Sequence, residues 1–299
     1  PEPPAPKVDR ALRWTARRWL CDDLTFASAH EPICEDFGRR HAREYEANHR
    51  VHVRWLRRVG GRARPTMLYL HSWMQPNTAW EERRLLPALG DKLGVNVAWM
   101  QLPYHGVRRP KGSKFDGEYF WTSDMVRTVE AIRQSVCDLR SAVRWFGEAT
   151  AEPVGALGVS LGGMIVLAGA CFEPRLAFAV PVVAHLDMAA IMEEASLLAR
   201  MRRDLRAHGW TGAEVEEYVR SLGLAELMPA IPKERILFIG GRYDKFLRPG
   251  RIEQLRRRWG GPAIVWFPGG HLGAFRYLSG KAASLRGFLA NLEIGADPR

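Results

Sequence analysis

From about residue 66 onwards, short apolar runs alternate with longer segments that have helical periodicity. Runs of this length, bounded by Gly, Pro and polar residues, are typical of strands buried on both faces of a parallel sheet. They cover residues 66–71, 95–101, 153–159, 176–183, 235–240 and 263–268. This alternation predicts an α/β fold with a mostly parallel central sheet and helices on both of its faces.

The clearest helical segment runs from about Asp124 to Phe146. Its apolar residues recur at steps of three and four, and Ser123 can serve as the N-cap. Upstream, residues 49–58 alternate apolar and polar side chains, which predicts an antiparallel edge strand. The first 45 residues are basic and look helical. We therefore expect a basic helical extension over residues 1–48 and one domain over 49–292.

Residues 187–228 interrupt the alternation of strands and helices. They are expected to form two or three consecutive helices, and Thr211 and Glu214 have capping-box spacing for the second. A helical insert between two parallel strands often forms a lid over the site. The alternative is an elaborated crossover that only packs against the sheet.

The composition, with 46% hydrophobic and 26% charged residues, is that of an ordinary globular protein. The formal net charge is +11, and arginine supplies nearly all of it because lysine occurs at only seven positions. This charge could attract an anionic partner, but the arginines are scattered and accompany no nucleic-acid-binding motif. We therefore expect solvated arginines and no specific nucleic-acid partner.

The cysteines and the hydropathy pattern bear on the compartment. Cys21, Cys34, Cys137 and Cys171 form no CxxC pair and are too few for a disulfide scaffold, which favours a reducing compartment. No apolar stretch reaches the roughly 18 residues that a transmembrane helix needs. The expected location is the cytoplasm, and the oligomeric state cannot be inferred.

The strongest local motif is Gly158-Val159-Ser160-Leu161-Gly162. It follows an apolar run and opens a helical one, which is the strand–turn–helix setting of a nucleophile elbow. Glycines on both sides remove side chains that would collide in so tight a turn. An ordinary glycine-rich turn is the alternative, but this context favours Ser160 as a nucleophile.

A serine hydroxyl needs a base, and the base needs an orienting acid. Asp244 follows one predicted strand and His271 follows the next, so both lie at the carboxyl ends of strands. The order nucleophile, acid, histidine is that of an α/β-hydrolase. The sequence thus predicts Asp244 as the acid and His271 as the base, with Asp187 as a rival acid.

An oxyanion formed in such a reaction requires preorganised donors. We expect them to be the backbone N–H groups of Leu161, which follows the nucleophile, and of Trp73, in the loop after the first parallel strand. The indole of Trp73 would then form a wall of the acyl pocket.

These motifs resemble the α/β-hydrolase superfamily over roughly residues 49–292, although the chain has His71-Ser72 where the family often has His-Gly. Residues 102–110 (LPYHGVRRP) also loosely resemble a poorly characterised bacterial and mitochondrial branch. In that segment His105, Arg108 and Arg109 either bind an anionic group of the substrate or hydrogen-bond a long loop.

The resemblance and the motifs together predict a serine hydrolase that cleaves a carboxylic ester, or a thioester or amide, through an acyl-enzyme on Ser160. The small-molecule acyl substrate could be anionic or lipid-like, with Met188 and Met192 of the insert lining its pocket. No cofactor is expected, and no metal, because His105, His185 and Asp187 are too dispersed. The alternatives are an acyltransferase or cyclase with the same triad, and a non-catalytic binding protein.

Overall fold

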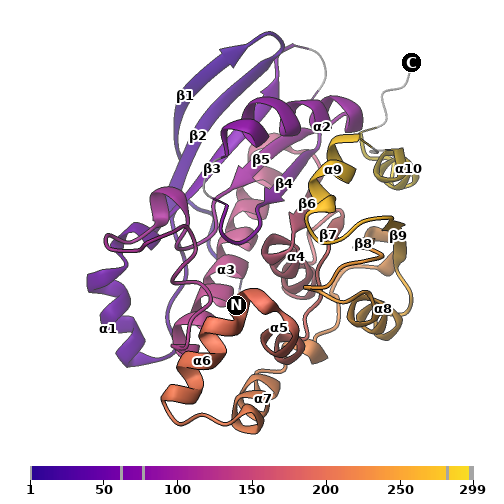
Figure 1. The fold of residues 1–299 in the computed structure, drawn as a ribbon. Coiled ribbons are helices and arrows are strands. Elements are labelled where there is room, and N and C mark those ends of the chain that lie inside the picture. The colour runs from indigo at the N-terminus through magenta and orange to yellow at the C-terminus, as the bar shows by residue number, and fades with distance from the viewer. Residues whose placement is uncertain (1, 61–62, 76–77, 281–282, 296–299) are drawn as a thin grey trace.

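The computed structural model describes residues 2–60, 63–75, 78–280 and 283–295, which form a nine-stranded sheet in the order β1-β2-β3-β5-β4-β6-β7-β8-β9 (Figure 1). The strands are β1 (Asp9–Ala16), β2 (Trp19–Ala27), β3 (Arg50–Arg58), β4 (Thr66–Leu70), β5 (Asn96–Met100), β6 (Val154–Val159), β7 (Ala179–Val182), β8 (Leu237–Gly241) and β9 (Ala263–Phe267). β5, β4, β6, β7, β8 and β9 are parallel to their neighbours in that order. All six predicted apolar runs are confirmed as strands.

The N-terminal segment differs from the prediction. Residues 9–27 are not helical; they form an antiparallel hairpin that pairs with β3, so β3 lies inside the sheet and β1 lies at its edge. Only α1 (Glu35–Glu44) fulfils the helical expectation there. Side chains of β1 are almost all exposed, so this strand lacks the apolar alternation by which strands are recognised, and long-range pairing with β2 stabilises it.

Helices cover both faces of the sheet, as predicted. They are α2 (Leu86–Leu93), α3 (Met125–Thr150), α4 (Leu161–Phe172), α8 (Pro249–Arg258), α9 (Gly273–Gly280) and α10 (Ala283–Asn291), besides those of the insert. Alternate side chains of β4 point to opposite faces: Leu68 and Leu70 join the core beneath α3 and α4, and Met67 and Tyr69 join the core beneath α2 and α10. Two apolar layers therefore fix the strands that bear the site.

The N-cap of α3 is Asp124, whose carboxylate accepts the N–H of Arg127 at 3.0 Å, and not Ser123. The predicted helix was therefore one residue too long at its start and four residues too short at its end. An aspartate at this position also has a favourable interaction with the positive end of the helix dipole.

The insert between β7 and β8 contains α5 (Met188–Glu194), α6 (Ala199–Ala207) and α7 (Gly212–Ser221). Figure 1 shows these three helices grouped together below α4. The capping box of α7 is confirmed, because Thr211 and Glu214 bond to each other's backbone N–H groups. We call residues 188–221, which contain α5, α6 and α7, the cap.

The sheet is weakly paired between β7 and β8. The ladder there has the single pair Val182 and Ile239, with one isolated bridge between Ala179 and Ile236. By contrast, β8 and β9 pair at five positions. The cap is therefore inserted at the least extensively paired junction of the parallel strands.

Within the described residues, no helix has the length and apolarity needed to cross a membrane. All four cysteines lie in the described part of the chain and are free thiols, with Cys21 buried.

Candidate active site

Ser160 lies at a sharp turn between β6 and α4. Its backbone has φ 55° and ψ −112°, a conformation that a non-glycine residue rarely adopts. The turn is possible because glycines lie where it is tightest: a Cβ on Gly158 would be 2.2 Å from the carbonyl oxygen of Gly162, and one on Gly162 would be 2.1 Å from that of Leu70. Such strain at a single serine is typical of a nucleophile elbow.

His271 and Asp244 complete a hydrogen-bonded chain with this serine. Nε2 of His271 lies 2.8 Å from Oγ of Ser160, and Nδ1 lies 2.7 Å from Oδ2 of Asp244. Because carboxylate oxygens accept, Nδ1 carries the proton and Nε2 accepts the serine O–H. The other oxygen of Asp244 accepts the N–H groups of Phe246 and Leu247 at 2.9 and 3.0 Å, which holds the carboxylate in place.

The rival acid, Asp187, occupies a different position. Its side chain caps α5 by accepting the N–H of Ala190 at 3.0 Å, and it pairs with Arg251 at 3.3 Å. Asp187 thus has a structural role at the base of the cap, and the carboxylate in contact with His271 is that of Asp244.

The two expected oxyanion donors lie on adjoining segments. Leu161 is the first residue of α4, so its N–H is one of those that a helix N-terminus leaves without an intrahelical acceptor. Trp73 follows β4, and its indole N–H donates to the carbonyl of Gly117 at 2.8 Å. The N–H of Gly162 donates to the carbonyl of His71 at 3.1 Å, which joins the elbow to the Trp73 loop.

The sequence did not indicate a role for His71. It is buried between the loop that contains Trp73 and the segment that begins at Leu102. Its Nε2 lies 3.0 Å from the N–H of Leu102 and must accept, so Nδ1 carries the proton and donates to the carbonyl of Ser72 at 2.8 Å. In a trans peptide the C=O and the following N–H point in opposite directions. Fixing the Ser72 carbonyl therefore fixes the direction of the Trp73 N–H. Burial lowers the pKa of His71 to about 4, which keeps the ring neutral.

Ser72, which stands where the superfamily often has glycine, does not strain this loop. Met74 has a positive φ of 60°, whereas the φ of Ser72 is not positive. A glycine is therefore not required at position 72.

A small cavity of about 60 Å³ lies beside Ser160 and His271. Its walls are almost entirely apolar. They are formed by Leu161 and Met164 of α4, Trp73 after β4, Trp121 before α3, Phe246 and Leu247 after β8, and Ile191, Ala195, Leu197 and Leu198 of the cap. The cap thus contributes to the cavity, but through other residues than those predicted. Met188 is buried in the core, and Met192 lines a second cavity within the cap.

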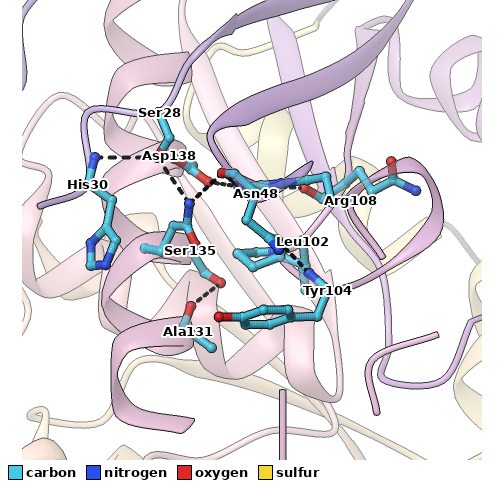
Figure 2. A network of polar contacts seen from close by, with 12 residues as sticks. Ser28, His30, Asn48, Leu102, Tyr104, Arg108, Ala131, Ser135 and Asp138 are labelled. Carbon is cyan, nitrogen blue, oxygen red and sulfur yellow. Dashed lines mark hydrogen bonds and ion pairs between the residues drawn. The ribbon is translucent and has the colours of Figure 1, made fainter. Parts of the chain in front are cut away.

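Most of the predicted anion-binding segment, residues 102–110, is buried. Figure 2 shows Arg108 within a network of polar contacts. The guanidinium of Arg108 donates to Asp138 at 2.9 Å and to the carbonyls of Gln101 and Asn48 at 2.9 and 3.0 Å. His105 is also buried and pairs through Nδ1 with the carbonyl of Pro103 at 2.8 Å. These contacts correspond to the loop-bonding alternative. Arg109 is partly exposed and lies 3.8 Å from Asp116.

Among the described residues, no group of three or more His, Cys, Asp or Glu side chains could hold a metal ion.

The strand order and the sharp turn at Ser160 are those of an α/β-hydrolase fold, and solved structures with this fold include several esterases. Acetyl xylan esterase 1 from Thermoanaerobacterium sp. JW/SL YS485 superposes with a TM-score of 0.62 over 91% of this chain and 88% of its own, at 16% identity. A cold-adapted esterase from an Arctic intertidal metagenomic library has a TM-score of 0.58 over 94% and 98% of the two chains, at 12% identity.

Two curated relatives come from Mycobacterium tuberculosis: uncharacterized protein Rv2627c of strain H37Rv and uncharacterized protein MT2702 of strain CDC 1551. Each relative is 30% identical to this chain over an alignment that covers 91% of this chain. The same alignment covers 65% of the length of each relative. No family model matches the chain.

Proposed function

We propose that this protein is a serine hydrolase that cleaves carboxylic esters with short, apolar acyl groups. The observation that carries the proposal is the chain of hydrogen bonds from Ser160 through His271 to Asp244, at 2.8 and 2.7 Å. The cavity beside it is apolar and has a volume of about 60 Å³, well below the roughly 300–1,000 Å³ of a pocket for a drug-sized ligand. Esterases among the structural neighbours, two of them acetyl xylan esterases, are consistent with a short acyl group.

In the proposed reaction, Oγ of Ser160 attacks the acyl carbon while Nε2 of His271 takes the hydroxyl proton. The N–H groups of Leu161 and Trp73 stabilise the oxyanion. When the bond to the alcohol breaks, His271 returns the proton to the leaving oxygen. Water then attacks the acyl-enzyme, gives one proton to His271, and releases the acid as Ser160 recovers its proton.

A fluorophosphonate probe tests the proposal. It should label the native protein and leave Ser160→Ala unlabelled, while Ser196→Ala, at an exposed serine of the cap, should label as the native protein does. Turnover of p-nitrophenyl acetate should fall with labelling. Equal labelling of folded Ser160→Ala would remove Ser160 from the mechanism. If the probe labels the protein and no ester is hydrolysed, but the acyl group is transferred to an added alcohol, the protein is an acyltransferase instead.

A further inference from the structure

The second cavity, which Met192 lines, lies within the cap, apart from Ser160. It has a volume of about 260 Å³, and we call it the cap cavity. Apolar residues line it (Met192, Leu205, Trp210 and Val215), and so do Arg202 and Arg206, besides Arg220 and Arg251. Neither Ser160 nor His271 takes part in it, so catalysis does not account for its composition.

Arg202 is held rigidly at this cavity. Its Nη1 donates to the carbonyls of Met192 and Ala195 at 2.7 and 2.8 Å, at the end of α5. These are carbonyls at a helix C-terminus, where a cation is favourable. Since both acceptors are neutral, its charge remains uncompensated by any carboxylate among the described residues. Arg206 lies one turn further along α6, is exposed, and has no ion-pair partner within that part of the chain.

The acidic side chains at the cap cavity do not neutralise these two arginines. Asp187 pairs with Arg251 at 3.3 Å, and Glu216 pairs with Arg220 at 2.6 Å. Glu193 is exposed at the rim and forms no ion pair among the described residues. The cavity therefore combines an apolar part with an excess of positive charge at a fixed position.

We propose that the cap cavity binds an aliphatic carboxylate, with its carboxylate on Arg202 and Arg206 and its chain along Met192, Leu205 and Trp210. A guanidinium recognises a carboxylate through parallel charge-assisted hydrogen bonds, and an apolar wall favours burial of an alkyl chain. The volume suits a ligand smaller than a typical drug molecule. The proposal is independent of the ester hydrolysis proposed above.

Binding here would be connected to the active site through α5. Met192 faces the cap cavity, whereas Ile191 and Ala195 face the cavity beside Ser160. Arg202 bonds to the carbonyls at the end of the same helix. A carboxylate that binds Arg202 would compete with the carbonyls of Met192 and Ala195 for its N–H groups. It would thereby change the position of α5, which forms part of the wall of the cavity beside Ser160.

Isothermal titration of Ser160→Ala protein with octanoate, and with 1-octanol as the neutral match, tests the proposal. Octanoate should bind and 1-octanol should bind at least about tenfold more weakly. In the same background, Arg202→Gln and Arg206→Gln together should weaken octanoate binding by about tenfold or more. Arg203→Gln, on the same helix but outside the cavity, should leave it within about twofold. If the double variant does not fold, Arg206→Gln alone can be used, because this side chain is exposed; it should also weaken octanoate binding.

Two tryptophan substitutions locate the site. Val215→Trp fills the cap cavity and should abolish octanoate binding, whereas Leu198→Trp fills the cavity beside Ser160 and should leave it unchanged. The reverse pattern, equal binding of octanol, or no heat up to about 10 mM octanoate would overturn the proposal.

Discussion

The guanidinium of Arg108 lies 2.9 Å from the carboxylate of Asp138, and neither side chain is exposed to solvent. Ser28 donates to the other oxygen of Asp138 at 2.6 Å, and Gln134 donates to the Asn48 carbonyl that Arg108 also contacts, at 2.7 Å. The pair thus joins the loop after β5 to α3 and to the start of β3.

We predict that Arg108→Met destabilises the protein by about 3–5 kcal/mol, because it leaves the Asp138 carboxylate buried without its cation. Arg108→Met combined with Asp138→Leu should lose less than the two single variants added together. Urea unfolding measures these free energies. A loss below about 1 kcal/mol in Arg108→Met, with a raised KM, would restore Arg108 as a substrate-binding residue.

For the acid of the triad, we predict that Asp244→Asn lowers kcat by about 10⁴-fold, as the corresponding change does in a serine protease, because an amide favours the wrong tautomer of the histidine. Asp187→Asn is the matched control. It keeps an N-cap for α5 and loses one partly exposed ion pair, so kcat should stay within about tenfold of the native value. A larger loss in Asp187→Asn than in Asp244→Asn would transfer the acid to Asp187.

The third prediction concerns His71 as a positioning residue. His71→Phe keeps a ring to stack on Trp99, whose centroid is 5.4 Å away, but loses both hydrogen bonds. If the ring fixes the Trp73 N–H, kcat should fall by about 10²–10³-fold with KM nearly unchanged, as expected for loss of one oxyanion donor. His71→Gln can restore one bond and should recover part of the rate. Equal losses of stability and activity, with no specific effect on kcat, would leave His71 with a purely structural role.

The cap should set the acyl length through Ile191 and Leu198. Leu198→Ala enlarges the 60 Å³ cavity, so the preferred p-nitrophenyl ester should shift to a longer chain. Met188→Ala, in the core away from that cavity, should lower stability by about 2–5 kcal/mol and leave the profile unchanged. A profile that responds to Met188 and not to Leu198 would contradict the arrangement of α5.

Acid should destabilise the fold before most carboxylates titrate. Burial lowers the pKa of His41, His52, His71 and His185 from 6.5 to about 4. Between these values the unfolded chain binds protons that the folded protein does not, so stability is present above about pH 6.5 and is lost as the pH falls towards 4. Tm should drop by at least about 5 °C between pH 7 and 5.

Calorimetry with a pair of variants checks this pH dependence. His185→Gln removes one buried titrating group and should reduce the slope of Tm against pH, whereas His208→Gln, at an exposed histidine, should not. A constant Tm from pH 7 to 5 would show that the buried histidines do not titrate on unfolding.

Much of the candidate site could be predicted from the sequence because its signals are local. A strand that ends at Val159, just before Ser160, and two later strands that precede Asp244 and His271 determine where three side chains meet. Parallel strands end at a common edge, so order along the chain becomes proximity in space.

The features that the sequence did not reveal depend on long-range contacts or on helix phase. β1 is a strand only because β2 pairs with it, and its exposed side chains carry no periodic signal. In α5, each residue is turned about 100° from the next, so Ile191 lines the cavity beside Ser160 while Met192 lines the cap cavity. The position of His71 behind the loop depends on the N–H of Leu102, 31 residues away.

The short pairing between β7 and β8 has a consequence for how the molecule opens. Ser160 follows β6, in the seven-stranded part of the sheet that ends with β7, whereas Asp244 and His271 follow β8 and β9, the two strands beyond this junction. With so few hydrogen bonds between the two parts, amide deuterium exchange should occur at the junction by local opening, well below the free energy of global unfolding. Such an opening would separate the imidazole of His271 from the hydroxyl of Ser160 and leave the imidazole paired with Asp244. The proposed nucleophile and its base would therefore be in contact only while β7 and β8 are paired.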